Sequence, residues 1–313
     1  MTRLAMLGAG SLGGLFAHHL ALGGADVHVI DLWKDHVEAI RTYGLRLQTG
    51  DEIITSPVRK ATTRAEEVGP VDVLVLFVKT NASREALASA SPMVGPETVI
   101  VTLQNGLGNA EVIRELYPRQ TVLYGLTTLT ADLLMPGLIA PRSTEGGMTD
   151  LWTVDSKNLK PVGHFVKLLT SGGITARVTP DIDLSIWKKL VVNCALNGLC
   201  AITDLTCEQL CAQEGIWKIL DKIADETSAL ARARGVLLES KNARSFLREV
   251  AQASAEHYPS MVFDIRKKRP TEIDSLNNAI VRGSQSIGLD ASANQVVVAL
   301  IKTLELNYHT PRH

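Results

Sequence analysis

Three polar side chains lie on one face of an otherwise apolar segment in the second half of the chain. Lys189, Asn193 and Asn197 follow one another at intervals of four, so a helix would align them in one stripe. Buried ammonium and amide groups are costly unless they find polar partners. The stripe predicts a substrate cleft, where the lysine donates a proton to a developing alkoxide and the amides bind a carboxylate or hydroxyl. The alternative is a lysine that reaches water and amides that bond neighbouring helices.

A glycine-rich loop near the N-terminus could bind a pyrophosphate. It follows the apolar run Leu4–Leu7 and precedes an apolar stretch that reads as a helix. Without Cβ atoms a phosphate can approach the backbone, and the following helix offers free N–H groups and partial positive charge. Asp31 ends the next predicted strand, where an acid can bind the adenosine ribose. The alternative is a surface turn with a chance glycine pattern. The predicted cofactor-binding residues of the loop are Gly8, Ala9, Gly10, Ser11, Leu12 and Gly13.

Hydrophobic periodicity places these residues in two domains of an α/β protein. Up to about residue 179, short apolar strands alternate with helices, which predicts βαβ units and a parallel sheet. Between Thr121 and Asp155 the pattern is too loose to predict elements. From Asp181 onward the strand signals stop and helices follow one another. We therefore expect a dinucleotide-binding domain at 1–179 and a helical substrate and catalytic domain at 180–313.

Composition argues against several classes of function. The 313 residues include 32 Lys and Arg and 33 Asp and Glu, and the net charge of −1 gives no basic surface for nucleic acid or anionic membranes. The apolar stretch from Leu4 to Gly24 contains histidines and many glycines, unlike a membrane span or a secretory signal. We therefore expect a small-molecule substrate and neither a nucleic-acid nor a membrane partner.

The cysteines lie close together in the second half of the chain. A metal site would need further ligands, and no histidine lies nearby in the sequence, so we interpret them as small buried side chains and expect no metal. Free thiols suit a reducing compartment, which favours a cytoplasmic protein. The four residues are Cys194, Cys200, Cys207 and Cys211.

The order of motifs along the chain resembles the ketopantoate reductase (2-dehydropantoate 2-reductase) family. The resemblance covers nearly the whole chain and implies a Rossmann domain followed by an all-helical domain like the C-terminal domain of 6-phosphogluconate dehydrogenase, with the active site between them. It implies NAD(P)H-dependent reduction of a 2-oxo acid to a D-2-hydroxy acid, foremost ketopantoate to pantoate. A homodimer is compatible with it. Besides the glycine loop, the matching segments are Val78-Lys79-Thr80, Gln104-Asn105-Gly106, Trp187-x-Lys189-Leu190, Asn193, Asn197, Ser260-Met261-x-x-Asp264, Thr271-Glu272-Ile273-Asp274, Asn277 and Asn294.

The resemblance also implies roles for single residues. Lys189 would be the general acid, and Glu272 would lie near Lys189 and the cofactor. Lys79 and Asn105 would lie by the nicotinamide half of the cofactor. The residues expected to contact the substrate are Asn105, Asn193, Asn197, Ser260 and His257, the last of which replaces a family Asn.

Each of these residues also has a structural alternative. Lys79 could be a solvated charge at the end of a strand, and Asn105 before a glycine is a common turn residue. Glu272 and Ser260 could cap helices. The ordered set, rather than any one motif, indicates the shared functional role.

The segment after the second predicted strand departs from the family pattern. The family commonly has an Arg there, which meets the 2′-phosphate of NADP, whereas this chain reads Asp31-Leu32-Trp33-Lys34. Two unit charges about 4 Å apart interact by about 4 kcal/mol at an effective dielectric of about 20, so a carboxylate disfavours a 2′-phosphate. We therefore expect NAD to be favoured over NADP, although Lys34 could neutralise a phosphate. Trp33 could stack on the adenine or pack under the helix.

Two other functions fit the same motifs. NAD-dependent D-mandelate dehydrogenases of the same superfamily act on a bulky 2-oxo acid, so a D-2-hydroxy acid dehydrogenase is the first alternative. The second is a dinucleotide sensor without catalysis. A sensor needs the glycine loop but no proton donor, so Lys189 and Glu272 argue against it.

Overall fold

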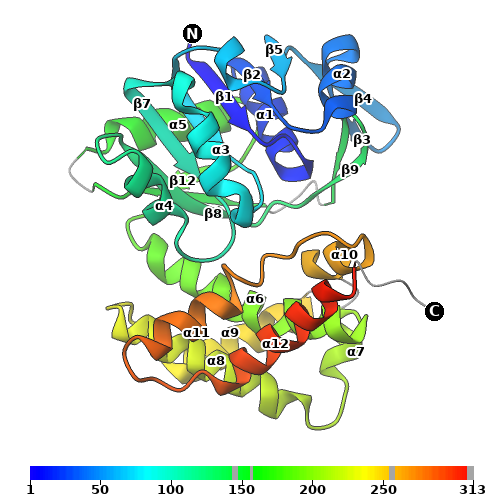
Figure 1. The fold of residues 1–313 in the computed structure, drawn as a ribbon, viewed down its shortest axis with the longest axis vertical. Helices are drawn as coiled ribbons and strands as arrows, with labels where there is room; N and C mark the ends of the chain where they lie inside the picture. The colour runs from blue at the N-terminus through cyan, green and yellow to red at the C-terminus, as the bar shows by residue number, and fades with distance from the viewer. Residues whose placement is uncertain (143–146, 156–157, 254–257, 309–313) are drawn as a thin grey trace. The chain divides into compact units, whose positions relative to one another are not determined.

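The chain divides into two compact units, which are described here one at a time (Figure 1). The computed structural model describes residues 1–142, 147–155, 158–253 and 258–308. The first unit is made of Met1–Gln104 and Asn109–Ile182, and the second of Asn105–Gly108 and Asp183–His313. The short segment Asn105–Gly108 therefore packs with the helical unit, although its neighbours in sequence belong to the sheet unit. The expected domain limits, 1–179 and 180–313, did not anticipate this segment and stay a prediction.

An eight-stranded sheet forms the centre of the first unit, in the order β12-β11-β8-β7-β6-β1-β2-β5. Within the described residues its neighbouring strands are parallel, apart from the antiparallel pair of β8 and β11. That pair lies in the region where the sequence pattern was too loose to predict elements. The strands are β1 (Arg3–Leu7), β2 (Asp26–Ile30), β5 (Lys60–Thr62), β6 (Val71–Leu76), β7 (Val94–Thr102), β8 (Val122–Thr127), β11 (Thr149–Thr153) and β12 (Ala176–Val178).

Helices cover both faces of this sheet, which explains why its central strands carry buried apolar residues on both faces. In β1, Leu4 and Met6 belong to a core that includes α1 and α5, whereas Ala5 and Leu7 belong to a second core that includes α3 and α4. The expected Rossmann-type arrangement of the first unit is therefore confirmed. Its helices are α1 (Ser11–Leu22), α2 (Lys34–Tyr43), α3 (Ser83–Ser89), α4 (Asn109–Leu116) and α5 (Lys160–Ser171), with the 3₁₀ helices η1 (Ala65–Glu67), η2 (Thr80–Ala82) and η3 (Ser91–Met93).

A smaller four-stranded sheet, in the order β4-β3-β10-β9, supports the start of α1. Ile139 is fully buried, and a Cβ added at Gly14 of α1 would lie 2.1 Å from its Cδ1. The turn between β9 and β10 contains Gly137, whose φ of +72° suits glycine. The strands are β3 (Leu45–Thr49), β4 (Glu52–Ser56), β9 (Ala131–Met135) and β10 (Leu138–Pro141).

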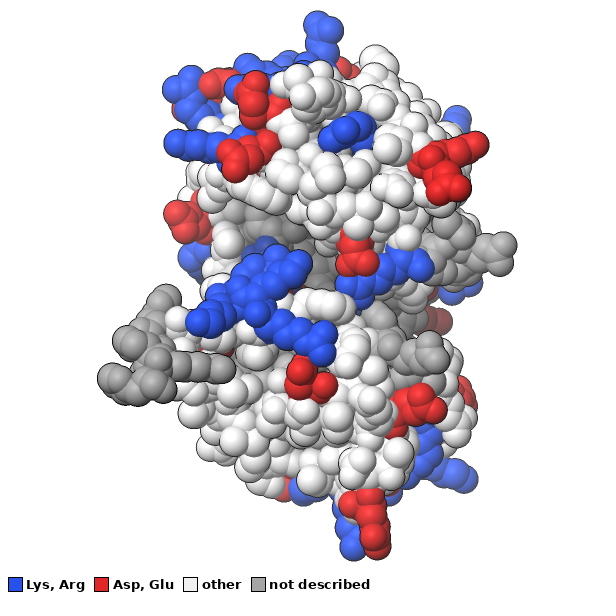
Figure 2. Space-filling model, turned by 90° about the vertical axis from the view of Figure 1, so that its right-hand side faces the viewer, with Lys and Arg blue, Asp and Glu red and all other residues white. Residues whose placement is uncertain are grey.

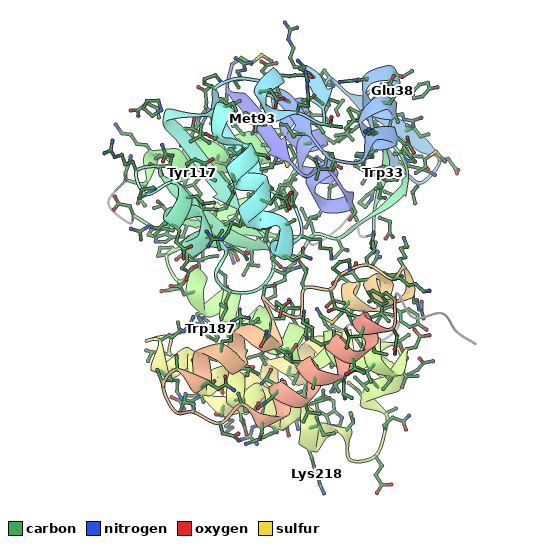
Figure 3. All side chains as sticks on the ribbon, viewed as in Figure 1. Trp33, Glu38, Met93, Tyr117, Trp187 and Lys218 are labelled. Carbon is green, nitrogen blue, oxygen red and sulfur yellow. The ribbon has the colours of Figure 1, made fainter. Side chains whose placement is uncertain are left out.

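The second unit is helical in its described residues, as expected. Its core gathers around α6, which contributes Trp187 (Figure 3), Leu190, Val191 and Cys194. Three of the cysteines are buried and Cys211 is partly exposed. The helices are α6 (Ile182–Thr203), α7 (Cys207–Cys211), α8 (Ile216–Ala233), α9 (Ser240–Ala253), α10 (Ser260–Arg266), α11 (Asn277–Gln285) and α12 (Ser292–Leu306).

The surface carries charges of both signs. On the face shown in Figure 2, Lys and Arg side chains lie among Asp and Glu side chains on each unit, in keeping with the net charge of −1. Among the described helices, none combines the length and the apolar character needed to cross a bilayer.

Candidate functional site

The loop between β1 and α1 is tightly packed at two glycines and open at the third. A Cβ at Gly8, whose φ is +89°, would lie 2.7 Å from the backbone nitrogen of Val78, and a Cβ at Gly13 would lie 2.1 Å from the carbonyl oxygen of Gly8. Around Gly10, no described atom comes within 4 Å of an added Cβ. Gly10 caps α1 without a side-chain hydrogen bond. There is thus room beside Gly10 at the start of α1, whose first N–H groups have no partner within the helix, and this fits a dinucleotide pyrophosphate.

Asp31 is anchored to this loop. It follows β2, and its Oδ2 accepts a hydrogen bond of 2.8 Å from the backbone N–H of Ala9. Its Oδ1 accepts a second one, of 2.9 Å, from the backbone N–H of Trp33. Each carboxylate oxygen has a further lone pair, so both can still accept from a ribose hydroxyl.

Trp33 and Lys34 begin α2 next to Asp31. The Trp33 ring stacks on His36, with 5.5 Å between the ring centroids and an interplanar angle of 11°. Trp33 is 45% exposed, and Figure 3 shows it at the start of α2. Lys34 is also exposed. The indole therefore packs on α2 through one side, and the remaining part of its surface is accessible.

Lys79 lies at the same edge of the sheet as the glycine loop, because both follow the carboxyl ends of neighbouring parallel strands. It follows β6 and precedes η2, and its side chain is exposed. Its neighbour Val78 is the residue that approaches Gly8. The first unit thus has the loop Gly8–Gly13, Asp31 and Lys79 at the carboxyl ends of neighbouring parallel strands.

The polar stripe of the second unit lies on α6, as the spacing predicted. Lys189 and Asn193 are half-buried, and Asn197 is 9% exposed. Within the described residues, the two Asn side chains make no hydrogen bond. The stripe extends over about 12 Å, at about 1.5 Å per helical residue. Both amides are therefore available to bind a ligand.

Lys189 has an acidic neighbour in Glu272. Burial lowers the pKa of the Lys189 ammonium to about 8, and the negative charge of Glu272 acts in the opposite direction. Glu272 precedes α11 in a segment that α12 holds in place, because Glu305 accepts hydrogen bonds of 2.8 Å from the backbone N–H and the hydroxyl of Thr271. A lysine with this pKa is mostly protonated at neutral pH and can act as a general acid.

Asn105 belongs to the same unit as the Glu272 segment. The backbone N–H of Leu107 donates a hydrogen bond of 3.0 Å to the carbonyl oxygen of Ser275. A Cβ at Gly106, whose φ is +86°, would lie 2.3 Å from that same oxygen. Glycine is therefore required beside Asn105 for this close approach, and the second unit brings Asn105 into the neighbourhood of Glu272 and Lys189.

Ser260 is the first residue of α10. Pro259, not Ser260, occupies the N-cap position, so the alternative role of Ser260 as a cap is wrong. Arg266 at the end of α10 forms an ion pair of 2.7 Å with Asp204, just after α6. Ser260 is exposed, and among the described residues it makes no hydrogen bond with the stripe. His257 lies outside the described residues.

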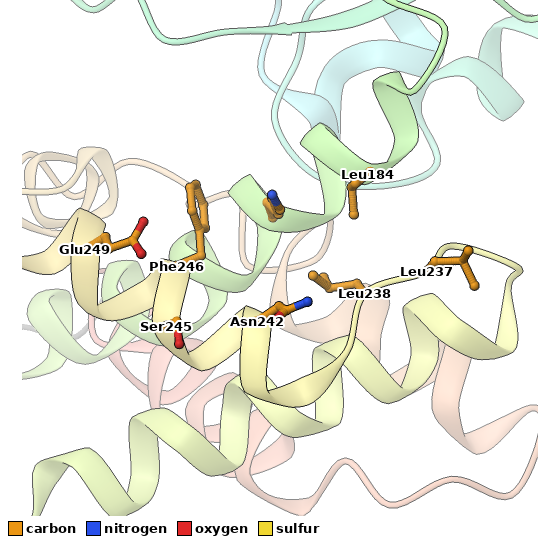
Figure 4. Close-up of a pocket in the computed structure, with 8 residues that line it drawn as sticks. Leu184, Leu237, Leu238, Asn242, Ser245, Phe246 and Glu249 are labelled. Atoms are coloured by element: carbon orange, nitrogen blue, oxygen red, sulfur yellow. The ribbon is translucent and has the colours of Figure 1, made fainter.

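A separate cavity of about 260 Å³ opens on a neighbouring face of α6 (Figure 4). Lys188 contributes to it from α6 and lies 5.5 Å from the ring centroid of Phe246 on α9. The expected site residues are not among those that line it, which are Leu184, Lys188, Leu237, Leu238, Asn242, Ser245, Phe246 and Glu249. Adjacent lysines of one helix thus face different surroundings.

His36 is a candidate functional residue that the sequence analysis missed. Its Nε2 lies 2.9 Å from the carbonyl oxygen of Ala9 in the cofactor loop. His36 lies in a helix rich in polar residues, and neither the hydrophobic pattern nor a motif in the sequence distinguishes it from a surface residue. Its side chain is nevertheless fully buried.

Comparison with known protein families gives matches along most of the chain. A model described as "Ketopantoate reductase PanE/ApbA" matches residues 4–149, and "Ketopantoate reductase PanE/ApbA C terminal" matches residues 181–305. The 2-dehydropantoate 2-reductase of Streptococcus pyogenes serotype M3 is 30% identical over 301 residues, which cover 95% of this chain and 96% of that protein. That of Halobacterium salinarum is 30% identical over 305 residues, 96% of each chain.

Solved structures of two kinds resemble the fold. D-mandelate dehydrogenase in a ternary complex with NADH and anilino(oxo)acetate superposes with a TM-score of 0.91, at 26% identity, over 99% of this chain and 100% of that chain. A PanE/ApbA family ketopantoate reductase from Ralstonia eutropha superposes with a TM-score of 0.88, at 27% identity, over 98% and 99%. The similarity therefore extends over both units of the chain.

Proposed function

Because the chain belongs to the ketopantoate reductase family, we propose that it reduces ketopantoate to D-pantoate with a nicotinamide dinucleotide. The observation that carries this proposal is the polar face of α6. Lys189, with Glu272 beside it, stands on the same face as two amides that make no hydrogen bond among the described residues. A binding protein without catalysis would not need a proton donor at this position.

Lys189 is the general acid of the proposed reaction. Bound NADH or NADPH would supply the hydride that the carbonyl carbon accepts. The Lys189 ammonium donates a proton to the carbonyl oxygen as negative charge develops there, and Glu272 helps to keep that ammonium protonated. Asn193 and Asn197 bind the carboxylate and the hydroxyl of the substrate, with Asn105, Ser260 and His257 as further contacts.

The cofactor is held by the first unit. The N–H groups at the start of α1 bind the pyrophosphate, Asp31 binds the adenosine ribose, and Lys79 lies towards the nicotinamide half. We propose NAD in preference to NADP, because both oxygens of Asp31 are fixed by backbone N–H groups and its charge would repel a 2′-phosphate.

The assembly we propose is a homodimer formed through α12. Its outward face is apolar, with Val296 60% exposed, Leu300 44% and Leu306 75%, and no charged residue occurs from Ser292 to Ile301. Such a face on a protein surface favours burial against a second copy. Light scattering on the wild type and on Leu300→Glu tests this, since the variant should have half the mass of the wild type. A wild-type monomer would contradict the proposal.

We place the protein in the cytoplasm. The four cysteines are free, and three of them lie in the core of the second unit. Free thiols persist in a reducing compartment. Fractionation of cells that express the natural protein would test this, and recovery from an oxidising compartment would contradict it.

A D-2-hydroxy acid dehydrogenase of D-mandelate type is the second candidate. The structural similarity at a TM-score of 0.91 favours it, and that relative was solved with NADH and an oxo acid that carries an aromatic group. The same Lys189 chemistry would serve both substrates. The two candidates therefore differ in the pocket around the substrate side chain and not in the proton donor.

Steady-state rates with ketopantoate and with phenylglyoxylate, each with NADH and with NADPH, distinguish the candidates. The proposal predicts the highest kcat/KM for ketopantoate with NADH. Rapid reduction of phenylglyoxylate with inert ketopantoate would establish the second candidate instead. If neither oxo acid were reduced although the dinucleotide binds, a sensor would be the better description.

A further inference from the structure

His36 of α2 is a buried side chain with a defined arrangement of donors and acceptors. Its Nδ1 accepts a hydrogen bond of 3.0 Å from the backbone N–H of Gly137, and its Nε2 lies 2.9 Å from the carbonyl oxygen of Ala9. An N–H can only donate and a carbonyl can only accept. His36 is therefore neutral with its proton on Nε2, and this proton is donated to Ala9.

The contact with Ala9 sets the direction of a peptide group in the cofactor loop. In a trans peptide the C=O and the N–H point in opposite directions. Because His36 holds the Ala9 carbonyl, the N–H of Gly10 points away from His36. Asp31 binds the N–H of Ala9 at 2.8 Å, so side chains orient both peptide groups that flank Ala9.

This orientation matters because the same loop has to accept an anion. The space beside Gly10 is open to an added Cβ, and α1 begins at the next residue. If the Ala9–Gly10 peptide turned over, a carbonyl oxygen would replace an N–H in that space. A carbonyl repels phosphate oxygens, whereas an N–H binds them.

We propose that His36 is a positioning residue for dinucleotide binding, whose Nε2–H holds the Ala9–Gly10 peptide with its N–H available to the pyrophosphate. This inference rests on the proposed cofactor site at Gly8–Gly13. It adds a requirement that the glycine pattern does not contain, namely an imidazole with its proton on Nε2 that is hydrogen-bonded to the Ala9 carbonyl. His36 does not touch the substrate in this role.

The surroundings of His36 oppose its protonation. Burial lowers the pKa of His36, and the nearby carboxylate of Asp31 acts in the opposite direction. Lys34 and Asp35 lie on the same helix as His36, and in the adjoining β9–β10 turn the Arg46 guanidinium lies 3.5 Å from the Pro136 carbonyl oxygen. A second proton on Nδ1 would remove the acceptor for Gly137. That proton would leave the Nε2–H donor to Ala9 in place.

Two substitutions separate the two hydrogen bonds of His36. The amide of Gln reaches about as far as Nε2, so His36→Gln retains a donor for Ala9, whereas Asn reaches only as far as Nδ1 and His36→Asn retains the acceptor for Gly137. The measurement is the dissociation constant of NADH in the absence of substrate, by calorimetry. We expect about tenfold weaker binding for His36→Asn and a change of less than about threefold for His36→Gln.

The two variants also distinguish this role from a purely structural one. Equal weakening by Asn and Gln, in proportion to their losses of thermal stability, would overturn the inference. So would wild-type affinity in both. Wild-type protein that binds no dinucleotide would instead count against the proposed function, because it would remove the cofactor site itself.

Nitrogen NMR of ¹⁵N-histidine-labelled protein gives an independent readout. The His36 signals are the ones that disappear in the His36→Gln variant. Their two-bond nitrogen–proton correlations should show the Nε2–H tautomer at neutral pH. A cationic or Nδ1–H imidazole at neutral pH would contradict the inference.

Discussion

The Asp31 carboxylate accepts a hydrogen bond of 2.8 Å from the backbone N–H of Ala9, so its negative charge is fixed against the glycine loop. A second hydrogen bond, from the N–H of Trp33 at 2.9 Å, holds the other oxygen. A carboxylate held at both oxygens cannot easily swing aside to admit a phosphate. The residue that would discriminate between the two cofactors is thus hydrogen-bonded to the loop that would bind them.

Asp31→Asn should relax cofactor preference. The Asn retains one acceptor oxygen but removes the charge, so the ratio of kcat/KM for NADPH to that for NADH should rise about tenfold. This corresponds to about a third of the ~4 kcal/mol for two unit charges about 4 Å apart. Lys34→Ala is the companion variant, because any help that Lys34 gives to a 2′-phosphate would disappear in it. A wild-type enzyme that prefers NADPH tenfold or more would contradict this role of Asp31.

Lys189→Ala should lower kcat by about 10²–10⁴-fold, the usual contribution of a general acid. The dissociation constant of NADH should change little, because the interaction strengthens only as the alkoxide forms. Lys188→Ala is the matched control, since Lys188 is the adjacent residue but lines a different cavity beside Phe246. Comparable losses of kcat in both variants would argue for a general effect on α6 and against the proton donor.

The rate of reduction should decrease at high pH. Burial lowers the pKa of Lys189 to about 8, so kcat/KM should be level below that pH and fall as the pH rises through it, because the proton donor is lost. Glu272 acts to raise this pKa, and Glu272→Gln should therefore move the decrease to lower pH. An unchanged profile in the Gln variant would show that the decrease belongs to another group.

Asn193→Ala and Asn197→Ala should reduce kcat/KM with little change in thermal stability. Neither amide makes a hydrogen bond within the described residues, so its removal leaves no buried partner unsatisfied. Asn294→Ala is the contrast, because Asn294 is fully buried and bonded to Glu226 and Asn277, at 2.8 and 3.0 Å. It should lose about 1–3 kcal/mol of unfolding free energy. Melting temperatures and kinetics on the same samples separate the two effects.

The cofactor loop could be predicted from the sequence because its requirements are local. Gly8 needs a positive φ and Gly13 must approach the Gly8 carbonyl, and both demands leave a glycine pattern next to a buried strand. The polar stripe of α6 could be predicted for a similar reason, since residues four apart lie on the same face of any helix. The confirmed Rossmann and helical units follow from the same kind of local periodicity.

His36 and the segment beside Asn105 could not be predicted in this way. His36 joins Ala9, 27 residues earlier, to Gly137, 101 residues later, and the turn that contains Gly137 belongs to the region without recognisable strands. The strands β9 and β10 have only five and four residues, too few to show a clear alternation. The packing of Gly106 on Ser275 likewise depends on a contact that only the folded chain creates.

The identity of the reaction product tests the central claim most directly. Purified enzyme is incubated with ketopantoate and NADH, and chiral chromatography of the product is compared with the amount of NADH consumed. The account predicts one D-pantoate formed per NADH oxidised, and only traces under the same conditions with Lys189→Ala. NADH consumption without pantoate, formation of the L-isomer, or undiminished D-pantoate from Lys189→Ala would contradict it.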